Sequence, residues 1–249
     1  MKWKRFLFLI LVIIFILAAC QGNVTPASDE AAFEIIRLQI TPGLAHWLDD
    51  VSACAETITN TGIVTDIRPK NNLDLADADL ILRLGTKEGA DPYVAVMGTE
   101  TIVIIAGDAV SVTSLSQETL QAIFSGRLQN WMDVPEMFGE EIDNNQPIQI
   151  LSYPEGHEIH LLFQETFLDG GRITEDSFVF STDDYLANLI QKNPAAIGYT
   201  LGSQIPNTAS TLDITDTDPS VGQHHVLAVT PAEPQGTLRA LLLCLQNAQ

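Results

Sequence analysis

The chain has 249 residues, of which 46% are hydrophobic and 18% are charged, and its 12 Lys and Arg against 32 Asp and Glu give a formal net charge of −20. This apolar content excludes an acidic disordered tail, and the length allows one or two domains with a hydrophobic core. The acidic balance argues against nucleic acid as a partner, because a phosphate backbone is bound by a basic surface.

The N-terminus has the pattern of a lipoprotein signal peptide. Three basic residues within the first five positions precede the apolar run 6–19, which is too short for a comfortable membrane span. The run ends in Leu17-Ala18-Ala19-Cys20, which resembles the bacterial lipobox. We expect residues 1–19 to be removed and Cys20 to carry the lipid, so that the protein is anchored to a bacterial membrane outside the cytoplasm. An uncleaved anchor helix with a chance cysteine is the alternative.

The segment after the lipobox is predicted to be a tether. Residues 20–32 are small and polar and include Pro26, as in flexible linkers. Without residues 1–19 the chain keeps 230 residues and a net charge of −23. Because this charge is repelled by anionic headgroups, the acyl chains are expected to provide the anchor.

Two further cysteines, Cys54 and Cys244, would lie in a compartment that permits disulfides. Each falls on the apolar face of an expected helix. We expect a disulfide that ties the first helix to the last, and two separately buried thiols are the alternative.

Short β-rich runs alternate with amphipathic helices beyond the tether, which predicts an α/β fold. The elements expected in the first part are strand 35–40, helix 44–58 and strands 63–67, 78–82, 94–97 and 101–106. The elements expected in the second part are helix 115–125, strand 148–151, helix 156–168, strand 178–180, helix 182–191, strands 195–200 and 226–229, and a final helix from about 234. Ser114 or Ser116 is the expected cap of the 115–125 helix, and Gly126 is its expected end.

The sequence lacks the common catalytic and phosphate-loop motifs, so we expect neither an enzyme nor a cofactor. The nearest approach to a metal motif is Gly156-His157-Glu158-Ile159-His160, with Glu155 or the His224-His225 pair as further ligands. Its histidines are three residues apart, whereas a zincin helix has them four apart. Solvated histidines at a helix start are the simpler interpretation, and no metal is expected.

Two turns that precede helices have the composition of an anion site. They are Thr41-Pro42-Gly43-Leu44 and Tyr153-Pro154-Glu155-Gly156, one in each part of the chain. Backbone N–H groups and the positive end of a helix dipole are available at such turns.

A resemblance to a known family relates these turns to a ligand site. The run 114–131, which ends Ile-Phe-Ser-Gly-Arg-Leu-Gln-Asn-Trp and continues to Asp133-Val134, resembles the start of the second lobe in phosphate-binding-type solute receptors of ABC transporters. Ala195-Ala-Ile-Gly-Tyr199 is similar to that family's Gly-x-Ile-Gly-Tyr strand, and 101–106 to its strand before the crossover. The resemblance implies two α/β lobes, each a mixed sheet flanked by helices, that close on a ligand between them. It implies lobe one at 33–107 plus 211–249 and lobe two at 108–210.

The chain departs from the family at the phosphate site. Where the family has Gly-Ser-Gly-Thr-Arg, this sequence has Gly156-His157-Glu158-Ile159-His160, and the first turn keeps only Thr41. The hydroxyl donors are therefore missing, and Glu158 adds a negative charge that should repel an anion. We expect no tight phosphate binding at neutral pH, with residual anion affinity rising as His157 and His160 become charged.

The resemblance implies a lipid-anchored solute-binding protein that delivers a small molecule or anion to the membrane subunits of an ABC transporter. The expected ligand contacts are Thr41, Gly43, Arg83, Gly156, His157 and His160. A binding-fold lipoprotein that has lost its small-molecule ligand and acts as a structural or partner-binding module is the alternative.

Overall fold

The computed structural model describes residues 33–249 except 88, 90, 91, 138–145, 219 and 249. Residues 34–249 form one compact unit. The expected signal peptide, the tether and Cys20 lie outside the described residues. Within the described part of the chain, no helix has the length and apolar character needed to cross a membrane.

A mixed sheet of ten strands runs through this unit, with the main strand order β2-β1-β3-β10-β4-β8-β6-β7. The strands are β1 (Glu34–Ile40), β2 (Thr61–Ile67), β3 (Leu80–Gly85), β4 (Tyr93–Gly107), β5 (Ser114–Leu115), β6 (Gln149–Ser152), β7 (Phe178–Val179), β8 (Ala196–Leu201), β9 (Ala209–Ile214) and β10 (Gln223–Thr230). The helices are η1 (Pro42–Trp47), α2 (Leu48–Glu56), η2 (Lys70–Asn72), α3 (Gln117–Phe124), η3 (Trp131–Asp133), η4 (Pro135–Met137), α4 (Glu158–Phe167), α5 (Asp183–Lys192), η5 (Gly202–Gln204) and α6 (Gly236–Ala248). The α/β fold with mixed sheets and flanking helices is confirmed.

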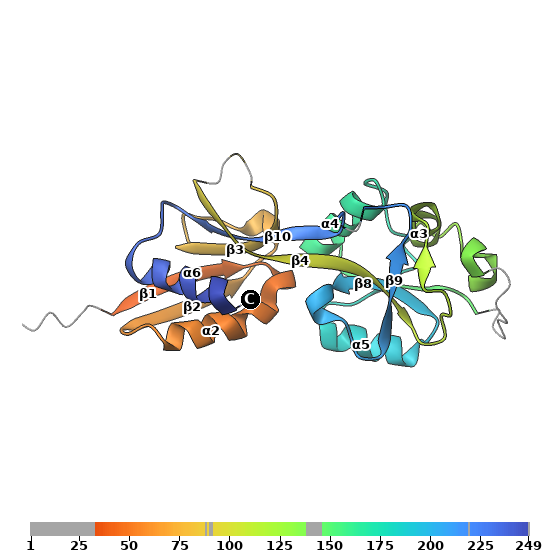
Figure 1. Ribbon diagram of the computed structural model, residues 1–249, viewed down its shortest axis with the longest axis horizontal. Helices are drawn as coiled ribbons and strands as arrows, with labels where there is room; N and C mark the ends of the chain where they lie inside the picture. The colour runs from red at the N-terminus through yellow and green to blue at the C-terminus, as the bar shows by residue number, and fades with distance from the viewer. Residues whose placement is uncertain (1–32, 88, 90–91, 138–145, 219, 249) are drawn as a thin grey trace, which may run out of the picture. The chain divides into compact units, whose positions relative to one another are not determined.

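The sheet is divided between two lobes (Figure 1). The first lobe is built on β1, β2 and β3, which are parallel, and on β10, which runs antiparallel to β3 and to the first part of β4. The second lobe is built on the last part of β4, which is antiparallel to β8 and β9, and on β6, which is parallel to β8 and β7. In Figure 1, β4 and β10 run from one lobe toward the other.

Strand β4 is one continuous strand, whereas the sequence predicts two strands separated at Gly98-Thr99. Gly98 keeps its place in the ladder opposite Val226, and the register shifts at Met97 of β4, because Leu227 pairs with Val96. The crossing between lobes therefore lies inside β4, because its pairing changes from β10 to β8 at Ile102. This places the change of lobe before the expected boundary at 107.

Strand β9 has no counterpart among the expected strands, and it lies in the polar stretch 206–220 of the sequence. Its residues pair with β4 and with β5, so 211–214 belong to the second lobe and not to the first. Only Leu212 of this strand is buried. A strand that buries one side chain leaves little hydrophobic periodicity in the sequence.

Helix ends follow the capping residues. The Ser116 side chain accepts from the backbone N–H of Thr119 at the start of α3, and Gly126, with φ of +77°, follows its end. Thr182 caps α5 in the same way through Tyr185. The expected helix 44–58 is divided into η1 and α2, with Pro42 at the first position of η1.

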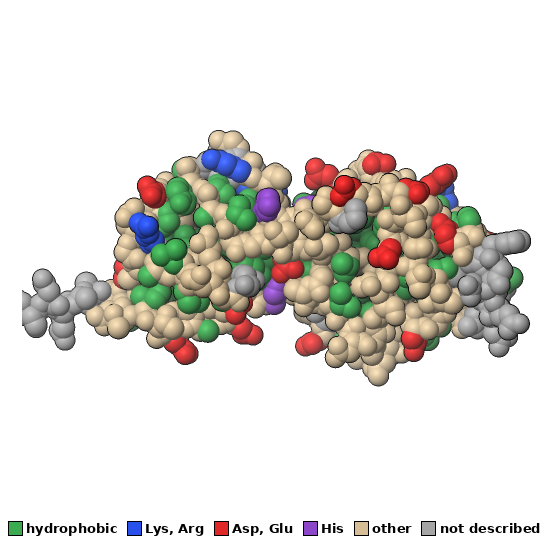
Figure 2. All heavy atoms as spheres, in the orientation of Figure 1, with side chains coloured by type: hydrophobic (Ala, Val, Ile, Leu, Met, Phe, Trp, Pro, Cys, Tyr) green, Lys and Arg blue, Asp and Glu red, His purple; other side chains and the backbone are tan. Residues whose placement is uncertain are grey.

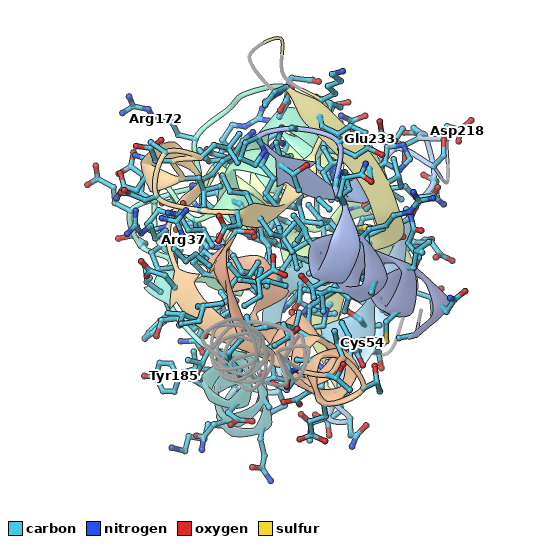
Figure 3. The ribbon with its side chains drawn as sticks, turned by 90° about the vertical axis from the view of Figure 1, so that its left-hand side faces the viewer. Arg37, Cys54, Arg172, Tyr185, Asp218 and Glu233 are labelled. Atoms are coloured by element: carbon cyan, nitrogen blue, oxygen red, sulfur yellow. A yellow bond between two sulfur atoms is a disulfide. The ribbon has the colours of Figure 1, made fainter. Side chains whose placement is uncertain are left out.

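Cys54 of α2 and Cys244 of α6 form a disulfide, with their Cα atoms 5.8 Å apart. Figure 3 labels Cys54 where α2 lies beside α6. The last helix is thus fixed to the first lobe, as it must be when the chain crosses back through β10.

One hydrophobic cluster extends through both lobes. It includes Leu44 of η1, Ile105 of β4 and Ile159 of α4, all of them fully buried. Phe163 stacks on Tyr199 within the same cluster, with ring centroids 3.8 Å apart. The turn after β1 and the start of α4 are therefore held in fixed positions by the core on both sides.

Candidate functional site

The candidate site lies where the turn after β1 and the end of β3 meet the start of α4. Because β1 and β3 are parallel, with Ile40 opposite Leu82, their carboxyl ends lie at the same edge of the sheet. The backbone N–H of Thr41 donates to the Leu82 carbonyl at 3.1 Å, and this hydrogen bond joins the segment after β1 to the last part of β3. Helix α4 comes to this edge from the second lobe.

Glu158, the first residue of α4, reaches across to the first lobe. Its Oε1 accepts from the backbone N–H of Gly43 at 3.1 Å, and its Oε2 accepts from the backbone N–H of Leu84 at 3.3 Å. The residue is only 1% exposed. A carboxylate of the second lobe is thus held by two backbone donors of the first lobe.

The side chain of Thr41 completes this group of donors. Thr41 is fully buried, and among the described residues its Oγ1 has no hydrogen-bond partner. We call the backbone N–H groups of Gly43 and Leu84 together with the Thr41 hydroxyl the cradle. Such convergent donors form an oxyanion site.

Burial raises the pKa of Glu158 above its usual range, because removal from water disfavours the charged carboxylate. The Thr41 hydroxyl, the Leu84 and Gly43 N–H groups and the charge of Lys70 act against this shift. The desolvation of the carboxylate raises the pKa by more than its donors and Lys70 together lower it.

Arg83, which the sequence analysis places after a strand ending at 82, lies inside β3, next to Leu84. It is 4% exposed, and its Nη1 donates to the Leu84 carbonyl at 3.4 Å. A Cβ placed on Gly85 would lie 3.7 Å from Arg83 Nη1 and 4.0 Å from Lys70 Nζ. Two cationic groups therefore stand near the edge of the cradle.

His157 is the N-cap of α4. Its Nδ1 accepts from the backbone N–H of Ile159 at 3.3 Å, and its ring stacks on Tyr153 with centroids 4.5 Å apart. Burial, together with the nearby His160, lowers the pKa of His157 to about 4. The imidazole is therefore neutral at pH 7, and the expected gain of positive charge occurs only as the pH approaches 4.

His160 belongs to a buried polar cluster of the second lobe. Its Nδ1 lies 3.0 Å from the Tyr153 carbonyl and 3.2 Å from both Ser152 Oγ and Tyr199 Oη. Burial lowers its pKa as well. Gly156, with φ of +86°, forms the turn before α4 and is exposed. These residues shape the start of α4, and Glu158 is the residue that reaches the cradle.

A second contact between the lobes was missed by the sequence analysis. Glu100 of β4 is 7% exposed and accepts from Ser203 Oγ of η5 at 3.0 and 2.9 Å. His46 Nε2 of η1 lies 3.1 Å from Glu100 Oε1, and Gln204 Nε2 donates to His46 Nδ1 at 2.8 Å. Up to 158 positions separate these residues, and no local pattern connects them.

The pKa of Glu100 is shifted in the opposite direction from that of Glu158. Burial alone would raise it, but hydrogen bonds from His46 and Ser203 and the proximity of His46 hold it below its usual range. Polar side chains from both lobes thus stabilise this buried carboxylate.

Other places in the described structure lack such a group of buried polar residues at a cavity. A cavity of about 450 Å³ in the second lobe is lined by β4, β9 and Phe167 and includes none of the predicted ligand residues. Within the described ranges, no group of three His, Cys, Asp or Glu residues could hold a metal ion. On the face drawn in Figure 2, acidic side chains are spread over both lobes.

Comparison with known proteins places the fold. A putative phosphate ABC transporter substrate-binding protein with bound phosphate from Clostridium perfringens is 18% identical, with a TM-score of 0.68 over 85% of this chain and 92% of that one. An ABC-type phosphate transport receptor from Vibrio cholerae is 14% identical, with a TM-score of 0.64 over 84% and 93%. A reduced form of OxyR from N. meningitidis is 14% identical, with a TM-score of 0.58 over 87% and 96%. The two-lobed fold is thus shared by transport receptors and by a regulatory protein.

Among curated proteins, no match to the sequence was found. The family model described as a PBP superfamily domain matches residues 86–236, more than half of the chain. These residues include all of β4, α4 and β10. The chain therefore belongs to the PBP superfamily.

Proposed function

We propose that this protein is a non-enzymatic solute-binding protein of an ABC transporter, held outside the cytoplasm by a lipid on Cys20. Three observations support this: the PBP superfamily match, the fold shared with two phosphate receptors, and the lipobox that ends at Cys20. The membrane subunits of the transporter are the proposed partner. Lipidation is tested by mass spectrometry of the membrane fraction, where a mature chain that begins at lipidated Cys20 is expected and an intact Met1 would contradict it.

The proposed ligand site lies between the lobes and includes the cradle. Thr41, Gly43 and Arg83 are on its first-lobe side, and the backbone N–H of Leu84 adds a donor that the sequence did not suggest. On the second-lobe side, Gly156, His157 and His160 shape the turn and the helix start that present Glu158. Closure of both lobes on one ligand follows from the higher affinity of the closed state.

Tight binding of phosphate is not part of this proposal. Phosphate is multiply charged and needs many donors to offset its desolvation, and each lost charge-assisted hydrogen bond forfeits about 1.5–3 kcal/mol. The cradle has two backbone donors and one hydroxyl, and Glu158 accepts from both backbone donors. The single observation that carries this conclusion is the Glu158 carboxylate in the place where an anion would be held.

The same observation favours a second candidate function. A chain whose own carboxylate fills the cradle is also suited to be a structural or partner-binding module without a small-molecule ligand. The two functions differ in one measurable property, namely whether any solute stabilises the folded state.

A thermal-shift screen of the mature protein separates them. The panel contains phosphate, sulfate, amino acids and divalent metal ions. A solute at 100 times its Kd stabilises the native state by about 2.7 kcal/mol, which raises Tm by several degrees. At least one such shift is expected for a solute-binding protein, and a flat response to the whole panel supports the partner-binding module instead.

A further inference from the structure

We propose that Glu158 is a tethered anion that occupies the cradle of the first lobe, so that the lobes close on each other without a solute and an anionic solute must displace the Glu158 carboxylate. Glu158 thus occupies the cradle in the resting protein, whether the protein binds a solute or acts as a partner-binding module.

The chemistry of the contact is that of a bound oxyanion. Each carboxylate oxygen of Glu158 receives one backbone N–H, from Gly43 at 3.1 Å and from Leu84 at 3.3 Å. Backbone donors that converge in this way accept a carboxylate, a sulfate or a phosphate alike. The donors come from one lobe and the acceptor from the other, so the hydrogen bonds exist only while the lobes are together.

The cradle has a donor group that the carboxylate does not use. Thr41 Oγ1 is fully buried without a hydrogen-bond partner among the described residues, although buried hydroxyls nearly always have one. The hydroxyl lies near enough to Glu158 to act against the rise of its pKa. A solute oxyanion that reached the Thr41 hydroxyl as well as both backbone N–H groups would supply the partner that this hydroxyl lacks.

Gly43 permits the close approach of the two lobes. A Cβ at this position would lie 2.7 Å from Glu158 Oε1 and 3.0 Å from Ile159 Cγ1. Both distances are too short for ordinary contacts, and Ile159 is itself fully buried. Because Glu158 already accepts from both backbone N–H groups in this close contact, a solute anion that uses these donors has to displace Glu158.

Occupation of the cradle by Glu158 lowers the apparent affinity of the protein for a solute anion. When the competent open state is a minor population of about 1–10%, the apparent affinity for an anion is reduced by the same factor. Removal of the Glu158 carboxylate should therefore increase the affinity for inorganic phosphate by about 10- to 100-fold.

The first test follows amide hydrogen exchange at Gly43 and Leu84 in the mature protein without solute. In the wild type both amides are expected to be protected. In Glu158→Ala both should exchange at least about tenfold faster, because opening a hydrogen-bonded contact exposes its donors. Glu165→Ala is the matched control, since Glu165 is exposed on the same helix and should leave exchange at both amides unchanged. Unprotected amides in the wild type, or equal exchange in wild type and Glu158→Ala, would overturn the proposal.

A second variant opens the contact while Glu158 stays intact. Gly43→Ala adds the Cβ that meets Glu158 and Ile159, so it should speed exchange at Leu84 as Glu158→Ala does. Gly89→Ala is its control, because a Cβ at Gly89 meets no atom within 4 Å. This pair keeps the test informative even when Glu158→Ala folds poorly.

The last step is titration of wild type, Glu158→Ala and Glu165→Ala with inorganic phosphate, sulfate and acetate. A gain in phosphate affinity of about tenfold or more for Glu158→Ala alone supports displacement. Equal phosphate affinities in all three proteins overturn it. The solute-binding function fails through a different result, namely the flat thermal response of the wild type to the solute panel.

Discussion

The two contacts between the lobes each bury one glutamate, and the two carboxylates are stabilised in opposite ways. Glu158 is held by the backbone donors of Gly43 and Leu84, and its pKa is raised by burial. Glu100 is held by Ser203 and His46, and its pKa stays below the usual range. Burial alone therefore does not predict how the pKa of a carboxyl group shifts, because the donors around the carboxylate decide whether its desolvation is offset.

The pKa shifts of Glu158 and Glu100 have opposite directions, so the two residues make stability depend on pH in opposite ways. The folded pKa of Glu158 is raised, so its contribution is fully present below the unfolded value of 4.5 and is lost as the pH rises through the folded pKa. The folded pKa of Glu100 is lowered, so its contribution is present above 4.5 and is lost as the pH falls through the folded pKa. Acid therefore weakens the Glu100 contact and favours the Glu158 contact.

The largest expected effect is a loss of global stability that leaves the Glu158 and Glu100 contacts between the lobes unchanged. The double substitution Cys54→Ser with Cys244→Ser removes a disulfide with a sequence separation of 190 and should lower the free energy of unfolding by about 3–5 kcal/mol in the chain-entropy model. The bond lies within the first lobe, so amide exchange at Gly43 relative to global unfolding should not change. Urea denaturation measures the loss, and a change below about 1 kcal/mol would contradict it.

The next effect breaks the second contact. Glu100→Gln removes the charge that receives hydrogen bonds from Ser203 and His46, and it should cost about 2 kcal/mol at pH 7. Glu158→Gln is the matched comparison. It should change stability by less than about 1 kcal/mol, because relief of desolvation offsets the lost acceptor. Equal losses in the two variants, measured by urea denaturation, would remove the distinction between the contacts.

The smallest effect concerns the cap of α4, which positions Glu158. The pKa of His157 falls from 6.5 to about 4 on folding, so only the unfolded state takes up a proton as the pH is lowered through this window. The wild type should lose about 1–3 kcal/mol between pH 7 and pH 4 relative to His157→Asn, a variant that retains a capping side chain. Parallel stability profiles of the two proteins would show that His157 does not titrate in this way.

Much of the fold was predictable from local signals. Ser116, Gly126 and Thr182 mark helix ends through capping and turn preferences that act within a few residues. The continuity of β4 and the existence of β9 were missed because both depend on pairing with distant strands. A polar edge strand such as β9 has little periodicity for a sequence analysis to detect.

The site was predictable in its position but not in its occupancy. Thr41 and Gly43 follow β1, and Arg83 lies in the last part of the parallel strand β3, so all three are at the same edge of the sheet. Glu158 was expected to repel an anion at this place, and the structure shows its carboxylate bound there. That contact joins residues 115 positions apart in different lobes, so only the closed arrangement of the lobes reveals it.

Calorimetry of the mature wild-type protein with inorganic phosphate at pH 7 tests the central claim most directly. With Glu158 in the cradle and His157 neutral, we expect the dissociation constant for phosphate to be micromolar or weaker. Submicromolar affinity would contradict it, because an anion would then displace Glu158 at little cost or would bind at a different site.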